Sequence, residues 1–301
     1  MTFASRWNLW SNSTGRSLRR RGGKVYRRLK KRLKRKPRYQ IAYDPALVPP
    51  PELISVHDDP VLEEWFRWAE EWSVLLRVYA GLGRKSHVLD IGCGLGRIAF
   101  PLRYIIRDGH YTGFDVDRRF INFLEKSFAP AYPSFKFVWA DLKNTYYNPG
   151  GTYETANYRF PCEAESVDVA FAASIFTHMV PHNTAHYFME TGRALKPGGK
   201  CLFSFFLLDH YRPSQPRPFM FAKANFSFGY SFDSYGDRFA ISRPDNPEFM
   251  TAYSTRLIQE MASAAGLRIS GPVLPGLWSG GFDNWVGVQD LVVLEKPSLA
   301  R

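Results

Sequence analysis

Apolar residues follow two alternating patterns from about residue 60 to the end of the chain. Short apolar runs typical of buried strands alternate with segments whose apolar residues repeat at helical spacing. The predicted strands are 86–91, 111–115, 135–139, 167–173, 200–207 and 288–294, and the predicted helices are 60–79, 98–107, 118–128, 183–195 and 255–265. Strands that alternate with helices in this way predict a parallel α/β sheet with helices on both faces.

Two long segments interrupt this alternation. Residues 142–166 are rich in Asn, Tyr, Gly and Pro, and residues 209–250 are rich in aromatic residues and Pro. Both segments follow predicted strands, and the ligand crevice of an open α/β sheet lies outside the carboxyl ends of its strands. Because loops of this length are usually functional, we expect both to be substrate-loop insertions.

Charge divides the chain into unequal parts. The formal net charge is +12, yet Arg16–Arg38 contains fourteen Lys or Arg residues and no acid, which leaves 26 bases and 28 acids elsewhere. Residues 1–43 are therefore interpreted as a basic N-terminal extension. Residues 44–59 follow as a Pro-rich linker, and residues 60–301 as the main domain.

The basic segment carries a narrow apolar stripe of Val25, Leu29 and Leu33 at helical spacing. Such a helix suits an anionic membrane surface or nucleic-acid phosphates, and a solvated tail is the alternative. The three cysteines form no CxxC pair, and no signal peptide or 18-residue apolar run occurs. We therefore expect a cytoplasmic protein, with peripheral contact to the inner face of the cell membrane as a hypothesis.

A glycine-rich loop follows the first strand. Gly92, Gly94 and Gly96 are spaced GxGxG directly after Val88–Ile91, and glycines allow a backbone to turn sharply and approach a ligand closely. A dinucleotide fingerprint needs Gly at position 97, where Arg97 stands, so binding of NAD is disfavoured. Asp115 ends the second strand, 19 residues beyond Gly96, where a carboxylate can accept both hydroxyls of a ribose.

The motifs resemble, in order, those of class I S-adenosylmethionine (SAM)-dependent methyltransferases. They read VLDIGCGLGR, GFDVD, WADL, SVDVAFAASIFTHM and RALKPGGK and extend over about residues 60–210. The resemblance implies a Rossmann-like, doubly wound sheet of seven strands, mostly parallel with an antiparallel last strand, and SAM as the cofactor. Within the family, FAASIFTHM, YYNPGG and FSFFLLD resemble a subgroup associated with bacterial glycan and natural-product genes.

The same resemblance implies roles for residues of this chain. The 92–96 loop would contact the methionine part of SAM, Asp115 the ribose and Asp141 the adenine, while Asp90 would orient the loop or contact the amino group. The full cofactor-binding set is Asp90, Gly92, Cys93, Gly94, Gly96, Asp115, Val116, Asp141, Leu142 and Ser174. For Cys93, a small packed residue is favoured over a nucleophile.

An oxygen acceptor needs a base to remove its proton. His178 follows the fourth strand and is the preferred base, with a role limited to hydrogen bonding or pocket shape as the alternative. Asp209 and His210 follow the fifth strand and either face the acceptor or lie exposed in a loop. His182 and His186 have the spacing of a metal site, but without a third ligand we expect no metal.

Aromatic residues of the two long segments, together with two tryptophans that follow them in the chain, have two interpretations, an acceptor-binding lid or a small accessory core. They are Tyr146, Tyr147, Phe226, Phe228, Tyr230, Phe232, Tyr235, Trp278 and Trp285.

Three functions follow from these patterns. The first is methyl transfer to a hydroxyl of a saccharide, glycan or other small molecule. The second is methylation of RNA gripped by Arg16–Arg38, against which stand the near-neutral remainder of the chain and the absence of an NPPY or DPPY motif. The third is a non-catalytic binding protein, which the complete glycine loop and Asp115 disfavour.

Overall fold

The computed structural model describes residues 44–54, 62–145, 147–212, 227–279 and 284–298. Three parts of the predicted organisation lie outside the described residues. They are the basic extension, residues 55–61 at the junction of the Pro-rich linker and the main domain, and residues 213–226 of the second long segment. Residues from Ala46 onward form one compact unit. None of the helices within the described ranges combines the length and hydropathy that crossing a membrane requires.

Seven strands form the main sheet in the order β3-β2-β1-β4-β5-β9-β8. Their bounds are β1 His87–Ile91, β2 His110–Asp115, β3 Phe135–Trp139, β4 Val167–Ala172, β5 Leu195–Phe205, β8 Arg268–Ile269 and β9 Asp290–Glu295. β1 pairs in parallel with β2 on one side and β4 on the other, whereas β9 runs antiparallel to both β5 and β8. The predicted seven-stranded sheet with an antiparallel last strand is confirmed.

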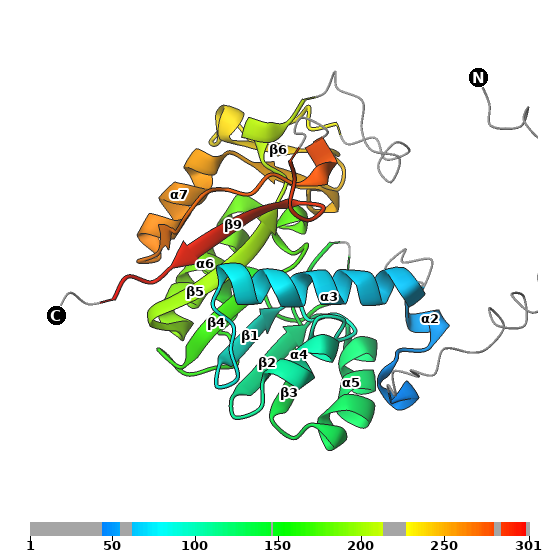
Figure 1. Cartoon of the computed structure of the whole chain (residues 1–301). Coiled ribbons are helices and arrows are strands. Elements are labelled where there is room, and N and C mark those ends of the chain that lie inside the picture. Colours follow the sequence, from blue (N-terminus) through cyan, green and yellow to red (C-terminus); the bar gives the residue numbers. More distant parts are fainter. Residues whose placement is uncertain (1–43, 55–61, 146, 213–226, 280–283, 299–301) are drawn as a thin grey trace, which may run out of the picture. The chain divides into compact units, whose positions relative to one another are not determined.

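Helices cover both faces of this sheet (Figure 1). α2 (Pro51–Ile54), α3 (Leu62–Tyr79), α4 (Ala99–Ile105) and α5 (Arg118–Ala131) contribute to one apolar core, and α6 (Pro181–Ala194) and α7 (Thr255–Ala264) to the other. Short 3-10 turns occupy Pro45–Leu47, Thr155–Asn157, Phe176–His178, Leu208–His210, Gly236–Arg238, Pro247–Phe249 and Leu277–Ser279.

Successive residues of the strands point to the two cores in turn. In β1, Val88 joins the core of α3, α4 and α5, whereas Leu89 joins that of α6 and α7. In β4, Phe171 and Ala172 divide in the same way. Because side chains alternate along a strand, a run that is apolar throughout supplies both faces of a sheet, which is why these strands read as continuous apolar runs.

The second long segment differs from the expected loop. It contains an antiparallel pair of short strands, β6 (Phe239–Ile241) and β7 (Thr251–Tyr253), that forms a second sheet. All six residues of the pair are buried. Three-residue strands are too short to show a period, so the sequence pattern gave no signal for them.

Candidate active site

A cavity of about 180 Å³ opens at the carboxyl ends of the central strands. Its walls include the turns after β1, β2 and β4, the point where the strand order reverses between β1 and its two parallel neighbours. Ligands of open α/β sheets bind at such a reversal. The described residues that line the cavity are Trp65, Asp90–Leu95, Arg97, Ile98, Phe114–Asp117, Phe120, Asn144, Tyr147, Thr155, Ala173–Ile175, His178, Met179, Tyr187 and Glu248.

The glycine loop has the backbone conformation that its sequence requires. Gly92, Gly94 and Gly96 have φ angles of 76°, 51° and 73°, a region that other residues rarely adopt. A Cβ on Gly92 would lie 2.0 Å from Cδ1 of Ile175, so the loop approaches the turn after β4 closely. Gly96 does not line the cavity; a Cβ there would lie 2.6 Å from Leu124 of α5, which makes this glycine a packing requirement.

Asp115 ties the end of β2 to the glycine loop. The Gly94 N–H donates to Oδ2 at 2.8 Å, and the Asp117 N–H donates to Oδ1 at 2.9 Å. Burial raises the pKa of Asp115 to about 6, while the two backbone hydrogen bonds act in the opposite direction. The carboxylate is thus fixed at the cavity wall with lone pairs suited to a pair of hydroxyl donors.

Asp90 is a buried carboxyl group in the cavity wall, with 1% of its surface exposed. The Tyr111 hydroxyl donates to Oδ2, whereas Oδ1 is sealed from solvent and lacks a hydrogen-bond partner within the described part of the chain. Burial raises the pKa of Asp90 to about 8, against the opposing effect of the Tyr111 hydrogen bond. Such an orphaned oxygen suits a bound ammonium group, whose charge and N–H donors would lower the cost of its burial.

The remaining predicted cofactor residues divide into two groups. Cys93, Val116 and Ser174 line the cavity. Ser174 has a φ of 61°, its N–H donates to Ser204 Oγ at 2.8 Å, and its hydroxyl donates to Gln289. The Cys93 thiol is buried, which raises its pKa well above the ordinary range and disfavours the thiolate that a nucleophile needs.

Asp141 and Leu142 lie outside the cavity lining. The Asp141 carboxylate accepts hydrogen bonds from Thr152 Oγ1 at 2.6 Å and from Asn148 Nδ2 at 3.3 Å, so it shapes the turn that follows β3. Leu142 is buried in the core beneath that turn. The adenine contact expected of Asp141 stays a prediction.

His178 lines the cavity from the 3-10 turn after β4. Its Nδ1 lies 3.2 Å from the carbonyl oxygen of Glu248, and because a carbonyl can only accept, Nδ1 carries the proton. The neutral imidazole then has its lone pair on Nε2. Burial lowers the pKa of His178, which favours this neutral form near pH 7.

Sequence reasoning missed the rest of this end of the cavity. Glu248 comes from the second long segment and Asn144 and Thr155 from the first, while Tyr187 comes from α6. Glu248 is buried, and its Oε2 accepts hydrogen bonds from the N–H and the hydroxyl of Thr145, each at 2.7 Å. A glutamate in a loop is common on protein surfaces, so no local signal marks this one as a buried link between two loops.

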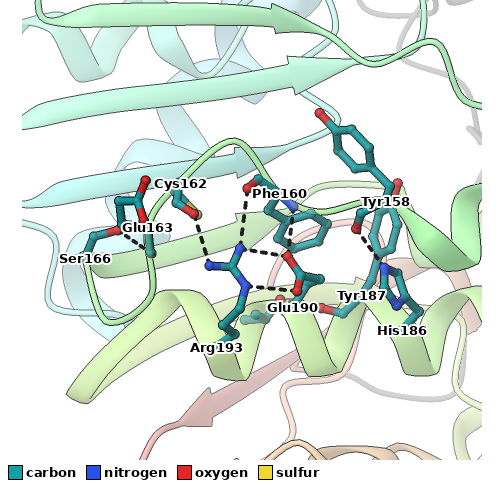
Figure 2. Close-up of polar contacts among 10 residues, drawn as sticks. Tyr158, Phe160, Cys162, Glu163, Ser166, His186, Tyr187, Glu190 and Arg193 are labelled. Atoms are coloured by element: carbon teal, nitrogen blue, oxygen red, sulfur yellow. Dashed lines mark hydrogen bonds and ion pairs between the residues drawn. The ribbon is translucent and has the colours of Figure 1, made fainter.

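A second set of polar contacts fixes the first long segment against α6 (Figure 2). Arg193 pairs with Glu190 at 2.7 Å and donates to the carbonyl of Cys162, and Glu190 accepts from the N–H of Phe160 at 2.8 Å. The Phe160 ring then packs edge-on against Tyr187 with ring centroids 4.9 Å apart. This clamp holds the Tyr187 ring in the cavity wall.

Asp209, His210 and His186 make hydrogen bonds within the protein. Asp209 accepts the N–H of Thr255 at the start of α7, and His210 Nδ1 lies 2.8 Å from the buried Asp290 carboxylate; neither lines the cavity. His186 Nε2 lies 2.7 Å from the carbonyl of Tyr158. No cluster of metal-ligating side chains occurs in the part of the chain that the structure describes.

The aromatic residues form an accessory core more than a lid. Phe228 and Trp278 pack together in a small buried cluster, and Phe232 and Tyr235 pack on the core of α6 and α7. Tyr147 lines the cavity, with its ring edge-on to His178 at 5.5 Å. Tyr230 and Trp285 are exposed, and Tyr146 and Phe226 lie outside the described residues.

Comparison with known proteins places this site in a family. Residues 88–199 match a family model described as a methyltransferase domain. Phthiotriol/phenolphthiotriol dimycocerosates methyltransferase 1 of Mycobacterium ulcerans is 29% identical over 119 residues, which are 40% of this chain and 37% of that protein. O-methyltransferase cnsE of Penicillium expansum is 24% identical over 133 residues, 44% of this chain and 42% of that protein. The chain thus spans about two fifths of the length of these curated relatives.

Solved structures with a similar chain path include two methyltransferases. A SAM-dependent methyltransferase from Aquifex aeolicus is 18% identical with a TM-score of 0.48, covering 84% of this chain and 98% of that one. The CcbJ methyltransferase from Streptomyces caelestis is 16% identical with a TM-score of 0.48, covering 77% and 90%.

The fold is that of an α/β protein with a cavity at the strand reversal, lined by a glycine loop. The family match makes this more specific: residues 88–199 match a methyltransferase domain, in agreement with the motifs that resemble those of class I SAM-dependent methyltransferases. The side chains present fit that cofactor. Asp90 offers an unpartnered oxygen to the amino group of a methionine moiety, Arg97 offers a positive charge to its carboxylate, and Asp115 offers its oxygens to a ribose.

Proposed function

We propose that this protein transfers a methyl group from SAM to a hydroxyl oxygen of a saccharide, glycan or other small molecule. The observation that carries the proposal is the orientation of His178, whose Nδ1–H donates to the Glu248 carbonyl inside the cavity that also holds the glycine loop and Asp115. When bound, SAM supplies a methyl group already activated by a positively charged sulfur. The chain must therefore position the acceptor, exclude water and take up a proton.

His178 is the base in this proposal. Its Nε2 lone pair accepts the proton of the acceptor hydroxyl, and the oxygen keeps the electron pair with which it would bond to the methyl carbon, while the methyl–sulfur bond would break with its electron pair left on the sulfur. A lowered pKa keeps the imidazole neutral and able to accept a proton at physiological pH. The Glu248 carbonyl also stabilises the imidazolium that forms, because Nδ1–H donates to it in both states.

The relatives support oxygen as the acceptor atom in part. The Penicillium protein is described as an O-methyltransferase, and the mycobacterial protein as a methyltransferase of phthiotriol and phenolphthiotriol dimycocerosates. These descriptions concern the acceptors of the two relatives and do not name the acceptor of this chain. The association of this chain with bacterial glycan biosynthesis rests on its sequence motifs.

The first test measures transfer of labelled methyl from SAM into fractions of a host lysate. The fractions are lipid and glycan, RNA, protein, and small metabolites, with Asp115→Ala as the control that removes a cofactor ligand. Label in the glycan or metabolite fraction that disappears in the control supports the proposal. Label in RNA favours the RNA methyltransferase, and failure to bind SAM or S-adenosylhomocysteine (SAH) favours a non-catalytic protein.

We further propose that Arg16–Arg38 makes peripheral contact with the anionic inner face of the cell membrane. Deletion of residues 1–40 should abolish sedimentation with phosphatidylglycerol liposomes and leave the affinity for SAM unchanged. Undiminished liposome binding by the truncated protein would refute this part of the proposal.

A further inference from the structure

Glu248 carries a carboxylate oxygen that the protein does not use. Oε2 accepts both hydrogen bonds from Thr145, each at 2.7 Å, whereas Oε1 has no hydrogen-bond partner within the described residues. Oε1 is not sealed from solvent, and Glu248 is one of the residues that line the cavity. The side chain as a whole is nevertheless buried, at 7% exposure.

A buried carboxylate with one unpaired oxygen is costly unless a donor reaches it. The donor cannot come from Thr145, because its N–H and its hydroxyl are already directed at Oε2. A molecule in the cavity that offers an O–H to Oε1 would complete the pairing, and hydrogen bonds to charged groups are among the stronger ones.

Tyr187 lines the same cavity as Glu248 and His178. Burial raises the pKa of its phenol, and the Asp115 and Glu248 carboxylates raise it further. The phenol is therefore a permanent O–H group that can donate to an acceptor oxygen. The cavity wall thus offers a donor in Tyr187 and an acceptor in Glu248 beside the His178 imidazole.

The charges at this end of the cavity are of one sign. The cavity is also lined by Asn144, Tyr147, Thr155, His178, Met179, Tyr187 and Glu248, and no Lys or Arg occurs among these seven described residues, whereas Arg97 lines it beside the glycine loop. An acceptor with a phosphate or carboxylate next to its reacting hydroxyl would meet Glu248 without a compensating base, which is unfavourable in a partly desolvated site.

We propose that Glu248 binds the acceptor and selects an uncharged polyol. Oε1 accepts a hydrogen bond from a second hydroxyl adjacent to the one that His178 deprotonates. This inference rests on the proposed methyl transfer to oxygen and makes the acceptor more specific: a ring or chain with neighbouring hydroxyls and no anionic group beside them.

The test compares Glu248→Gln with the matched control Thr145→Val in the full-length protein. The probes are methyl pyranosides with neighbouring hydroxyls, the matching uronates and the matching amino sugars, each offered with labelled SAM. Glu248→Gln keeps the size of the side chain and removes its charge. Thr145→Val removes one hydrogen bond to Oε2 and leaves Oε1 in place.

We expect the wild type to methylate neutral pyranosides in preference to uronates. Glu248→Gln should raise the acceptor KM by about 10- to 100-fold, the range for loss of a hydrogen bond to a charged group, with unchanged SAH affinity by calorimetry. Thr145→Val should leave the acceptor KM near that of the wild type.

Two results would overturn the inference. Equal effects of both variants on acceptor KM and thermal stability would show that Glu248 merely ties the two loops together. Preference for uronates or amino sugars, or no transfer to any pyranoside, would refute the neutral polyol. If the neutral polyol is refuted but SAH still binds and label from SAM still appears in another small molecule of the lysate, only the choice of acceptor is wrong, and the proposed methyl transfer is retained.

Discussion

Replacement of Asp90 by Asn should make the stability of the cofactor-free protein less sensitive to pH. Burial raises the pKa of Asp90 from 3.8 to about 8. The folded state therefore holds a proton that the unfolded state has lost, and the stability that this proton contributes falls as the pH rises toward 8. In Asp90→Asn the Tyr111 hydroxyl keeps an oxygen acceptor, while the titration is gone.

The expected difference follows from proton linkage. Each pH unit across which the folded state retains the extra proton changes the free energy of unfolding by about 1.4 kcal/mol. Between pH 6 and pH 8 the wild type should therefore lose about 2–3 kcal/mol more than Asp90→Asn. At pH values above 8 the variant should be the more stable protein, because only the wild type then buries a charged carboxylate.

Urea unfolding at pH 6, 7 and 8, monitored by tryptophan fluorescence without SAM, measures this difference. Asp108→Asn is the control, since that carboxylate is exposed and its hydrogen bond to Arg84 holds its pKa below the ordinary value. Its contribution is lost only as the pH falls toward acid, so this variant should follow the wild-type slope between pH 6 and 8. Equal slopes for Asp90→Asn and the wild type would refute the argument from burial.

Three further predictions concern the glycine loop, the proposed base and the buried hydrogen bonds of Asp290 beside the accessory core. Gly92→Ala places a non-glycine residue at φ 76° with its Cβ 2.0 Å from Ile175 Cδ1. The left-handed conformation alone should cost about 1–2 kcal/mol. Calorimetry should therefore show weaker binding of SAH, and the additional substitution Ile175→Ala, which removes only the clash, should restore it only in part. His178→Gln should lower kcat/KM by about 10²- to 10⁴-fold with unchanged SAH affinity. At saturating SAM, the wild-type kcat/KM for the acceptor should rise with pH and level off near pH 7, because burial lowers the pKa of His178 from its ordinary value. A rising limb above pH 7 under these conditions would point to a different base. Asp290→Ala leaves several buried donors without an acceptor, among them Trp278 Nε1 at 2.6 Å, and should lower the free energy of unfolding by about 3–5 kcal/mol in urea titrations.

The strands of the main sheet were predictable where each is a continuous apolar run. Residues 135–139 were predicted as a strand and form β3 with the same bounds. β8 has only two residues, one of them exposed, so it gives no pattern of its own and was anticipated only through the family resemblance. Helix ends differ by a few residues; α6 begins at Pro181, because proline is favoured in a first turn, where its missing N–H has no partner to lose.

The cofactor end of the site was predictable because its residues occur at fixed distances from strand ends. A parallel sheet brings the carboxyl ends of neighbouring strands to one edge, and the glycine loop and Asp115, both predicted to bind the cofactor, meet there through the Gly94 N–H. Asp141 shows the limit of this reasoning, since its place at the end of the third strand did not disclose that Thr152 and Asn148 would bind its carboxylate.

The sequence by itself determined the fold class and the glycine loop, because periodic burial and backbone freedom are properties of short stretches of chain. SAM as the cofactor followed from the resemblance of the ordered motifs to a known family. Only the tertiary structure decided the acceptor end of the cavity. Thr145 and Glu248 lie 103 positions apart, in two segments without a regular pattern, and they meet because each loop must leave the same edge of the sheet. Hydrogen bonds between loops depend on where the whole fold places them, and no local periodicity records that placement.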